Sequence, residues 1–177
     1  DGLSMLATVE NATNDVTDML QRIRELAVQA ANDTNSVKDR GFLQTEVNSL
    51  LQEINRVATQ TIYNNKVVLD GTLSGNFQVG TEKGQTISFD IKSIDTDTLE
   101  LTDKTGDPTF ATGTYVIDAD AASDKTGTAG AISILTATDA TNSLEKISAA
   151  LEQVAGNRAV YGALQNRLEY TVSNLMN

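Results

Sequence analysis

Apolar side chains near the start of the chain recur in alternating steps of three and four positions. This period is typical of a long helix that packs lengthwise on partner helices. A second apolar set repeats beside the first every seven positions, which makes the face wide enough for two neighbouring helices. We predict a helix over residues 3–32, roughly 45 Å long at about 1.5 Å per residue. The first set is Leu6, Val9, Thr13, Val16, Leu20, Ile23, Ala27 and Ala30, and the second is Met5, Ala12, Met19 and Leu26.

The same period returns twice further along the chain. After a polar break at residues 32–36, it resumes with Leu43, Val47, Leu50, Ile54 and Val57. A short polar break between two periodic helices predicts an antiparallel helical hairpin, which we expect to end near Asn64–Asn65. A third helix is expected to begin at a capping box formed by Asn142 and Glu145 and to run for about 35 residues. Its apolar positions are Leu144, Ile147, Leu151, Val154, Tyr161, Leu168, Val172 and Leu175, interrupted by Arg158 and Gln165.

Residues 67–138 have a different character, because they are rich in Gly, Thr, Asp and Ser. Ile87, Phe89 and Ile91 alternate with polar residues, which predicts a half-buried strand, and residues 76–79 are its expected partner across the loop 80–84. Weaker strand candidates are Leu99 with Leu101, residues 115–117, and Ile132 with Ile134. We expect turns at Asp70–Gly71, Ser74–Gly75, Thr105–Gly106 and Thr126–Gly127.

These patterns predict a mainly α fold with a small β part. We expect an elongated bundle of three long helices, two N-terminal and one C-terminal, with a β-hairpin and a short β-rich central insertion. We assign residues 1–92 and 138–177 to a helical rod core with its packed β-hairpin, and residues 93–137 to the insertion.

Composition narrows the possible functions. The chain carries a formal net charge of −11, which disfavours nucleic acid and anionic membrane surfaces as partners. It contains no Cys and no His, so a Ser-His-Asp triad, thiolate chemistry and a typical zinc site are excluded. It also lacks an apolar run long enough to insert into a membrane. We therefore expect neither an enzyme nor a cofactor.

Several segments resemble bacterial flagellin. They are residues 1–4 (Asp-Gly-Leu-Ser), 20–29 (Leu-Gln-Arg-Ile-Arg-Glu-Leu-Ala-Val-Gln), 53–57 (Glu-Ile-Asn-Arg-Val), 68–71 (Val-Leu-Asp-Gly), 77–80 (Phe-Gln-Val-Gly) and 164–168 (Leu-Gln-Asn-Arg-Leu). They follow one another in the family's order and spacing. The resemblance covers roughly residues 1–92 and 140–177. The remaining stretch corresponds to a region in which flagellins vary.

The resemblance implies a secreted structural subunit of the extracellular flagellum, which is exported unfolded and polymerises with other flagellin subunits into the motility filament. In the family, segments beyond both ends of this core drive polymerisation. They are not in this sequence, so we expect this chain alone to be a monomer.

The resemblance also implies recognition by the host innate immune receptor Toll-like receptor five. The family's receptor-binding residues fall on Arg22, Leu26 and Glu46, flanked by Gln21 and Gln29. The spacing of Arg22, Leu26 and Gln29 places them on one helix face, and an antiparallel hairpin places Glu46 opposite Leu26. A cation, an apolar side chain and an anion would then form one patch. From spacing alone, ordinary surface ion pairs of Arg22 with Asp18 and Glu25 are the favoured interpretation, and it is the family resemblance that favours a binding patch.

Two alternatives remain open at this stage. The first is a flagellar hook-filament junction protein, which shares its terminal helices with flagellin. The second is a calcium-dependent adhesin module that would use Asp95 with Asp97 or Asp118 with Asp120. Neither pair has the Gly and terminal Glu spacing of an EF-hand loop, so a solvated acidic loop is favoured.

Overall fold

The computed structural model describes residues 2–80, 84–96, 98–101 and 132–176. Three long helices dominate it, α1 (Gly2–Ala30), α2 (Val37–Gln60) and α3 (Ala137–Met176). Among the described residues between α2 and α3 there are four short strands, β1 (Ile62–Tyr63), β2 (Lys66–Val67), β3 (Ser74–Gln78) and β4 (Thr86–Asp90). The predicted mainly α fold with three long helices is therefore confirmed. Among the described helices, none is long and apolar enough to cross a membrane.

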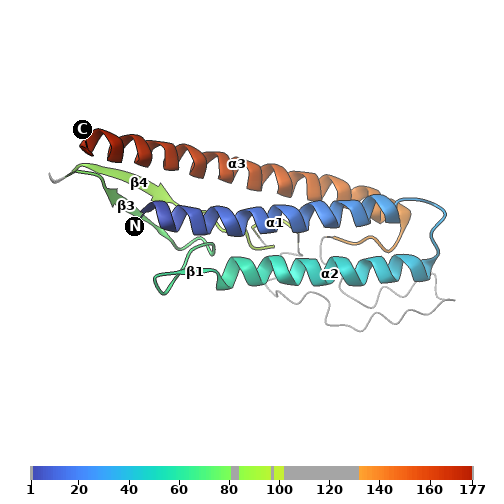
Figure 1. Ribbon diagram of the computed structural model, residues 1–177. Coiled ribbons are helices and arrows are strands. Elements are labelled where there is room, and N and C mark those ends of the chain that lie inside the picture. Colours follow the sequence, from blue (N-terminus) through green and yellow to red (C-terminus); the bar gives the residue numbers. More distant parts are fainter. Residues whose placement is uncertain (1, 81–83, 97, 102–131, 177) are drawn as a thin grey trace.

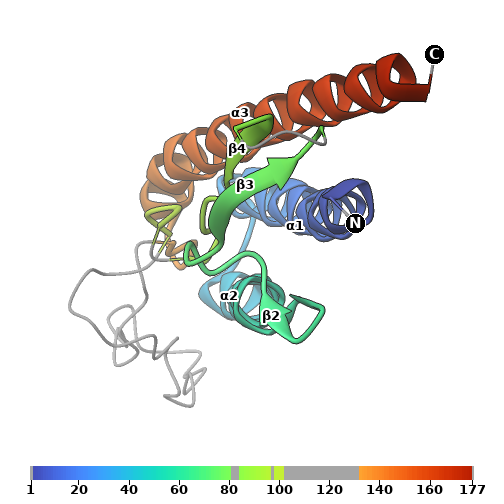
Figure 2. The same ribbon diagram turned by 90° about the vertical axis from the view of Figure 1, so that its left-hand side faces the viewer.

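The helices form an elongated bundle in which α1 packs against both α2 and α3 (Figure 1). α1 and α3 run antiparallel, and the two chain termini lie at the same end of the rod. The view from that end places α1 between its two partners (Figure 2). The wide apolar face predicted for the first helix is thus used on both sides. Buried residues from the three helices include Leu6, Val9, Val16, Leu20 and Ile23 of α1, Val47, Leu51 and Ile54 of α2, and Ile147, Val154, Tyr161 and Leu168 of α3.

The break between α1 and α2 is built as the polar sequence predicts. Ser36 caps α2, because its hydroxyl accepts a hydrogen bond from the Asp39 amide while the Asp39 carboxylate accepts one from the Ser36 amide. α2 ends at Gln60, earlier than the expected end near Asn64–Asn65. Both Asn residues have positive φ and form the two-residue turn between β1 and β2. The two Asn residues therefore signal this small hairpin turn and not the helix end.

The start of α3 differs from the expectation. The helix begins at Ala137, and the Thr136 hydroxyl accepts a hydrogen bond from the Asp139 amide. Asn142 and Glu145 are exposed residues inside the helix, so the predicted capping box is wrong. α3 has 40 residues and is longer than predicted. The reason is that Thr136, which precedes the predicted start, accepts a hydrogen bond from one of the first free amides of the helix.

The predicted β-hairpin is confirmed as the antiparallel pair of β3 and β4. Ile87 is buried and Phe89 half-buried, as the alternation predicted, and Phe89 stacks on Phe77 with ring centroids 4.3 Å apart. Ser74 and Gly75 belong to β3 and not to a turn, so that expectation is wrong.

Two of the weaker strand candidates are also wrong, because Leu99 with Leu101 and Ile132 with Ile134 lie outside any strand. All four side chains are instead buried in the common hydrophobic core. Their alternation reflects burial of every second residue without a neighbouring strand. Residues 115–117 and the expected turns at Thr105–Gly106 and Thr126–Gly127 lie outside the described residues.

Candidate functional site

The candidate surface centres on an ion pair that joins α1 to α2. Arg22 Nε donates a hydrogen bond to Glu46 Oε1 at 2.9 Å, and Arg22 Nη2 donates to Glu46 Oε2 at 3.3 Å. This two-pronged geometry holds the guanidinium in one orientation across the helix–helix boundary. Arg22 Nη1 also donates to Glu25 Oε2 at 3.2 Å, within α1. Among the described contacts, Arg22 therefore pairs with Glu25 and not with Asp18.

The ion pair remains accessible to solvent. The side chains of Arg22 and Glu46 are 48% and 44% exposed. Hydrogen bonding to Glu46, and then to Glu25, raises the pKa of Arg22, so its charge is permanent at any physiological pH. Exposure and salt screening keep the contribution of such a pair to folding small. The pair therefore presents a fixed cation next to an anion at the surface and adds little to the stability of the fold.

Leu26 does not join this surface. Its side chain is only 1% exposed, whereas Gln21 and Gln29 on the same helix are exposed. The predicted patch of a cation, an apolar side chain and an anion is therefore only partly formed: Arg22 and Glu46 meet, but Leu26 lies in the core beneath them. The sequence could not distinguish the two, because position 26 lies at the edge of the apolar face and burial there depends on how closely α2 packs.

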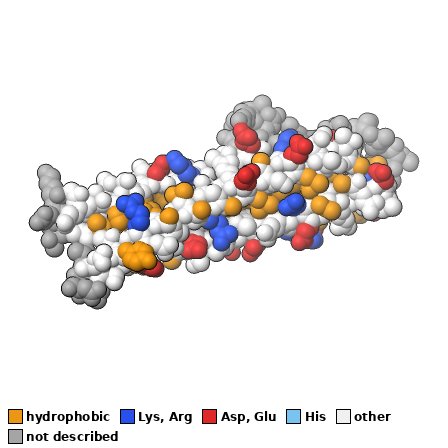
Figure 3. All heavy atoms as spheres, turned by 90° about the horizontal axis from the view of Figure 1, so that it is seen from above, with side chains coloured by type: hydrophobic (Ala, Val, Ile, Leu, Met, Phe, Trp, Pro, Cys, Tyr) orange, Lys and Arg blue, Asp and Glu red, His pale blue; other side chains and the backbone are white. Residues whose placement is uncertain are grey.

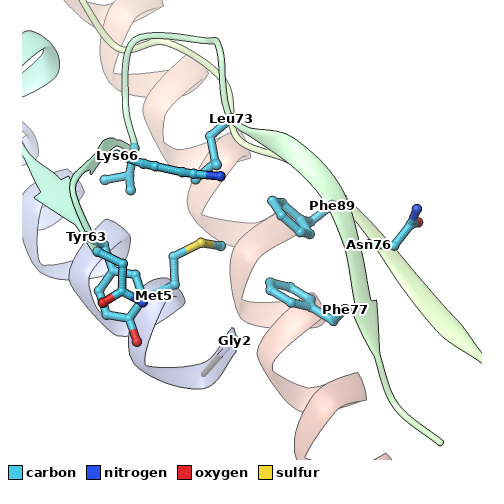
Figure 4. Close-up of a pocket in the computed structure, with 10 residues that line it drawn as sticks. Gly2, Met5, Tyr63, Lys66, Leu73, Asn76, Phe77 and Phe89 are labelled. Atoms are coloured by element: carbon cyan, nitrogen blue, oxygen red, sulfur yellow. The ribbon is translucent and has the colours of Figure 1, made fainter.

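A pocket of about 320 Å³ lies where α1 begins beside the β-hairpin (Figure 4). Phe77 and Phe89 form one wall, Met5 projects into the space, and the Lys66 side chain extends across it. Gly2 belongs to the same wall, and a Cβ atom added there would lie 2.8 Å from the Phe77 ring. The glycine of the motif at residues 1–4 is thus required for the close approach of the hairpin. Sequence reasoning missed this pocket.

Metal binding finds no support in the part of the chain that the structure describes. There, no three His, Cys, Asp or Glu residues lie close enough together to hold a metal ion. Asp95 accepts a hydrogen bond from the Thr98 amide at 2.7 Å in a local turn. Asp97, Asp118 and Asp120, the other members of the proposed calcium pairs, lie outside the described residues.

The fold is thus an elongated bundle of long helices, with a charged pair held across two of them. Comparison with known proteins gives the family. Residues 1–74 match the family model described as the bacterial flagellin N-terminal helical region. A flagellin of Halalkalibacterium halodurans is 34% identical over the whole chain, which covers 56% of that relative. A flagellin of Serratia marcescens is 40% identical over 79% of the chain and 43% of the relative.

Solved structures agree with this match. The crystal structure of Bacillus cereus flagellin superposes with a TM-score of 0.72 at 27% identity, covering 98% of this chain and 85% of that one. The chain belongs to the bacterial flagellin family. It spans about half the length of the curated relatives it matches.

Proposed function

We propose that this chain is the rod core of a structural subunit of the bacterial flagellar filament, which works outside the cell in motility and without catalysis. The observation that carries the proposal is the antiparallel packing of α1 on α3, which joins the two ends of the sequence along one buried seam. A rod of this kind can add many small lateral contacts along its length. Figure 3 displays a face on which hydrophobic side chains run lengthwise between charged ones, as such contacts require.

A chimaeric flagellin tests this proposal. This chain would replace the matching segment of the Halalkalibacterium relative, and the chimaera would be expressed in a strain that lacks its own flagellin. We expect long filaments by electron microscopy and restored swimming. The variant Val16→Asp is the control, because Val16 is fully buried and an unpaired charge there should prevent folding. A chimaera that is exported and folded but forms no filament, or only short junction-like structures, would contradict the proposal.

We further propose that the exposed surface formed by Gln21, Arg22, Gln29 and Glu46 is read by Toll-like receptor five. The support is the ion pair of Arg22 and Glu46, which presents both charges in one fixed arrangement. Leu26 is only 1% exposed, so in this proposal it supports the packing of α1 and does not touch the receptor. A charged pair already held in place loses little side-chain entropy when a partner binds.

The receptor proposal is tested in a reporter assay with the folded chain. Arg22→Ala and Glu46→Ala should each reduce activation, with helicity and melting temperature nearly unchanged. Arg56→Ala is the matched control, because Arg56 forms an exposed ion pair with Glu53 on α2. The double exchange Arg22→Glu with Glu46→Arg keeps an ion pair of reversed direction and should still fail to activate. Activation by Arg22→Ala equal to that of the parent chain would remove the proposal.

A further inference from the structure

Gln44 is a buried polar residue near the start of the otherwise apolar buried face of α2. Its side chain is 0% exposed, although α2 otherwise buries mainly aliphatic residues. Burying a carboxamide that has no hydrogen-bond partner is unfavourable in free energy. The hydrogen bonds of Gln44 therefore explain how it can be buried at this position. Those contacts lead to a segment far away in the sequence.

The Gln44 carboxamide bonds to residues 132–134 as a neighbouring strand would. Nε2 donates to the Ile132 carbonyl oxygen at 3.1 Å, and Oε1 accepts from the Ile134 amide at 2.6 Å. In an extended chain, the carbonyl of one residue and the amide two residues later point to the same side, and a parallel strand bonds to such a pair. The Gln44 side chain thus takes the place of a neighbouring strand beside the segment that contains Ile132 and Ile134.

The orientation of the carboxamide is fixed. Nε2 makes a second hydrogen bond to Asn48 Oδ1 at 3.0 Å, so both its donors have acceptors. Turning the group over would place its oxygen against the Ile132 carbonyl oxygen and its nitrogen against the Ile134 amide. Neither contact is a hydrogen bond, so only one orientation satisfies the buried groups.

α3 holds the same segment from the other side. The Ser143 hydroxyl, on a residue that is 2% exposed, donates to the Ser133 carbonyl oxygen at 2.7 Å. Ile132 and Ile134 are buried in the core between these attachments. Since the bonded segment ends only a few residues before α3 begins, the contacts also set where α3 starts relative to α2.

We propose that Gln44 and Ser143 form a clasp that binds the extended segment 132–134 between α2 and α3 and opens as a local unit, independently of the bundle. The clasp is one site with a defined occupant, an extended stretch with branched aliphatic side chains at alternate positions. It holds the segment through three hydrogen bonds and two buried isoleucines at the end of the bundle away from the chain termini, whereas α1 and α3 share a long apolar seam. Opening this short segment exposes less apolar surface than separating α1 from α3, so it should cost less free energy than unfolding the bundle.

Native-state hydrogen exchange of the full chain tests the clasp. The Ile134 amide should be protected in the parent chain, and its exchange should rise less steeply with urea than that of Val16, because opening the clasp exposes less surface than unfolding the bundle. In Gln44→Leu, the Ile134 amide should exchange at least about tenfold faster, while amides in the middle of α1 and α3, such as those of Val16 and Val154, change little. Gln52→Leu is the matched control, since Gln52 is an exposed residue of the same helix.

Two further variants keep the test decisive if Gln44→Leu fails to fold. Ser143→Ala removes only the attachment from α3 and should also accelerate Ile134 exchange. Gln44→Glu keeps the acceptor for the Ile134 amide but loses the donor to the Ile132 carbonyl. Its Ile134 exchange rate should be at least intermediate between those of the parent chain and Gln44→Leu. Exchange of Ile134 that is unprotected in the parent chain, that is unchanged by every variant, or that accelerates by the same factor as Val16 and Val154, would overturn the proposal.

Discussion

Replacing Leu26 with alanine tests whether this residue supports the bundle or faces a partner. Its side chain is 1% exposed in the common hydrophobic core, so the substitution removes buried methyl groups and leaves a cavity. Such substitutions cost about 2–5 kcal/mol. For a chain of this size, each kcal/mol lowers Tm by roughly 2–4 °C, so we expect a fall on the order of 4–20 °C.

Thermal unfolding followed by far-ultraviolet circular dichroism measures this effect. Val28→Ala is the matched control, because Val28 lies two positions away on α1 but is 56% exposed. It removes apolar atoms without leaving a cavity, so its Tm should remain close to that of the parent chain. If Leu26→Ala were as stable as Val28→Ala, the burial argument would fail and Leu26 would have to be available at the surface.

One more variant at position 26 separates packing from direct contact in the proposed receptor recognition. Leu26→Met nearly conserves volume and should retain both stability and activation. Leu26→Ala should lose activation in parallel with its loss of folded structure, whereas Arg22→Ala should lose activation while remaining folded. An activation loss in Leu26→Met without destabilisation would indicate that the receptor reads the leucine itself.

Two further predictions concern pH and a buried hydroxyl. Hydrogen bonds from Ser36, Arg56 and Thr72 lower the pKa values of Asp39, Glu53 and Asp70 respectively. The stability that these carboxylates contribute is complete above their ordinary pKa near 4 and is lost as the pH falls through the lowered pKa values. Because the chain has no His, the free energy of unfolding measured in urea should be constant between about pH 5 and 8 and should decline below about pH 4. This decline should be smaller in Asp39→Asn. Tyr161 is 2% exposed, and its hydroxyl oxygen accepts a hydrogen bond from the Lys92 amide at 2.9 Å. Tyr161→Phe should therefore lower the free energy of unfolding in urea by about 1–3 kcal/mol. A loss below about 0.5 kcal/mol would show that water replaces the hydroxyl.

The local sequence determined the helices and the turns between them. The repeat from Leu6 to Ala30 places apolar residues on one face of a helix whatever surrounds it, and the Ser36–Asp39 capping box satisfies the first amides of α2 using neighbours alone. The positive φ of Asn64 and Asn65 likewise follows from the tolerance of asparagine for that conformation. The start of α3 also had a local signal, the spacing of Thr136 and Asp139, which the pair Asn142 and Glu145 obscured.

Only the tertiary structure decided which residues meet from distant parts of the chain. Position 26 is buried and position 22 exposed because α2 covers one edge of the apolar face of α1, and no local pattern states where that edge falls. The alternation of Ile132 and Ile134 predicted a strand, yet the hydrogen-bonding partner of this segment is the side chain of Gln44, 88 and 90 positions earlier. Periodicity predicts that a residue will be buried, because burial requires only an apolar face. Which group forms hydrogen bonds with the buried backbone depends on how distant parts of the chain pack, and this is settled only in the complete fold.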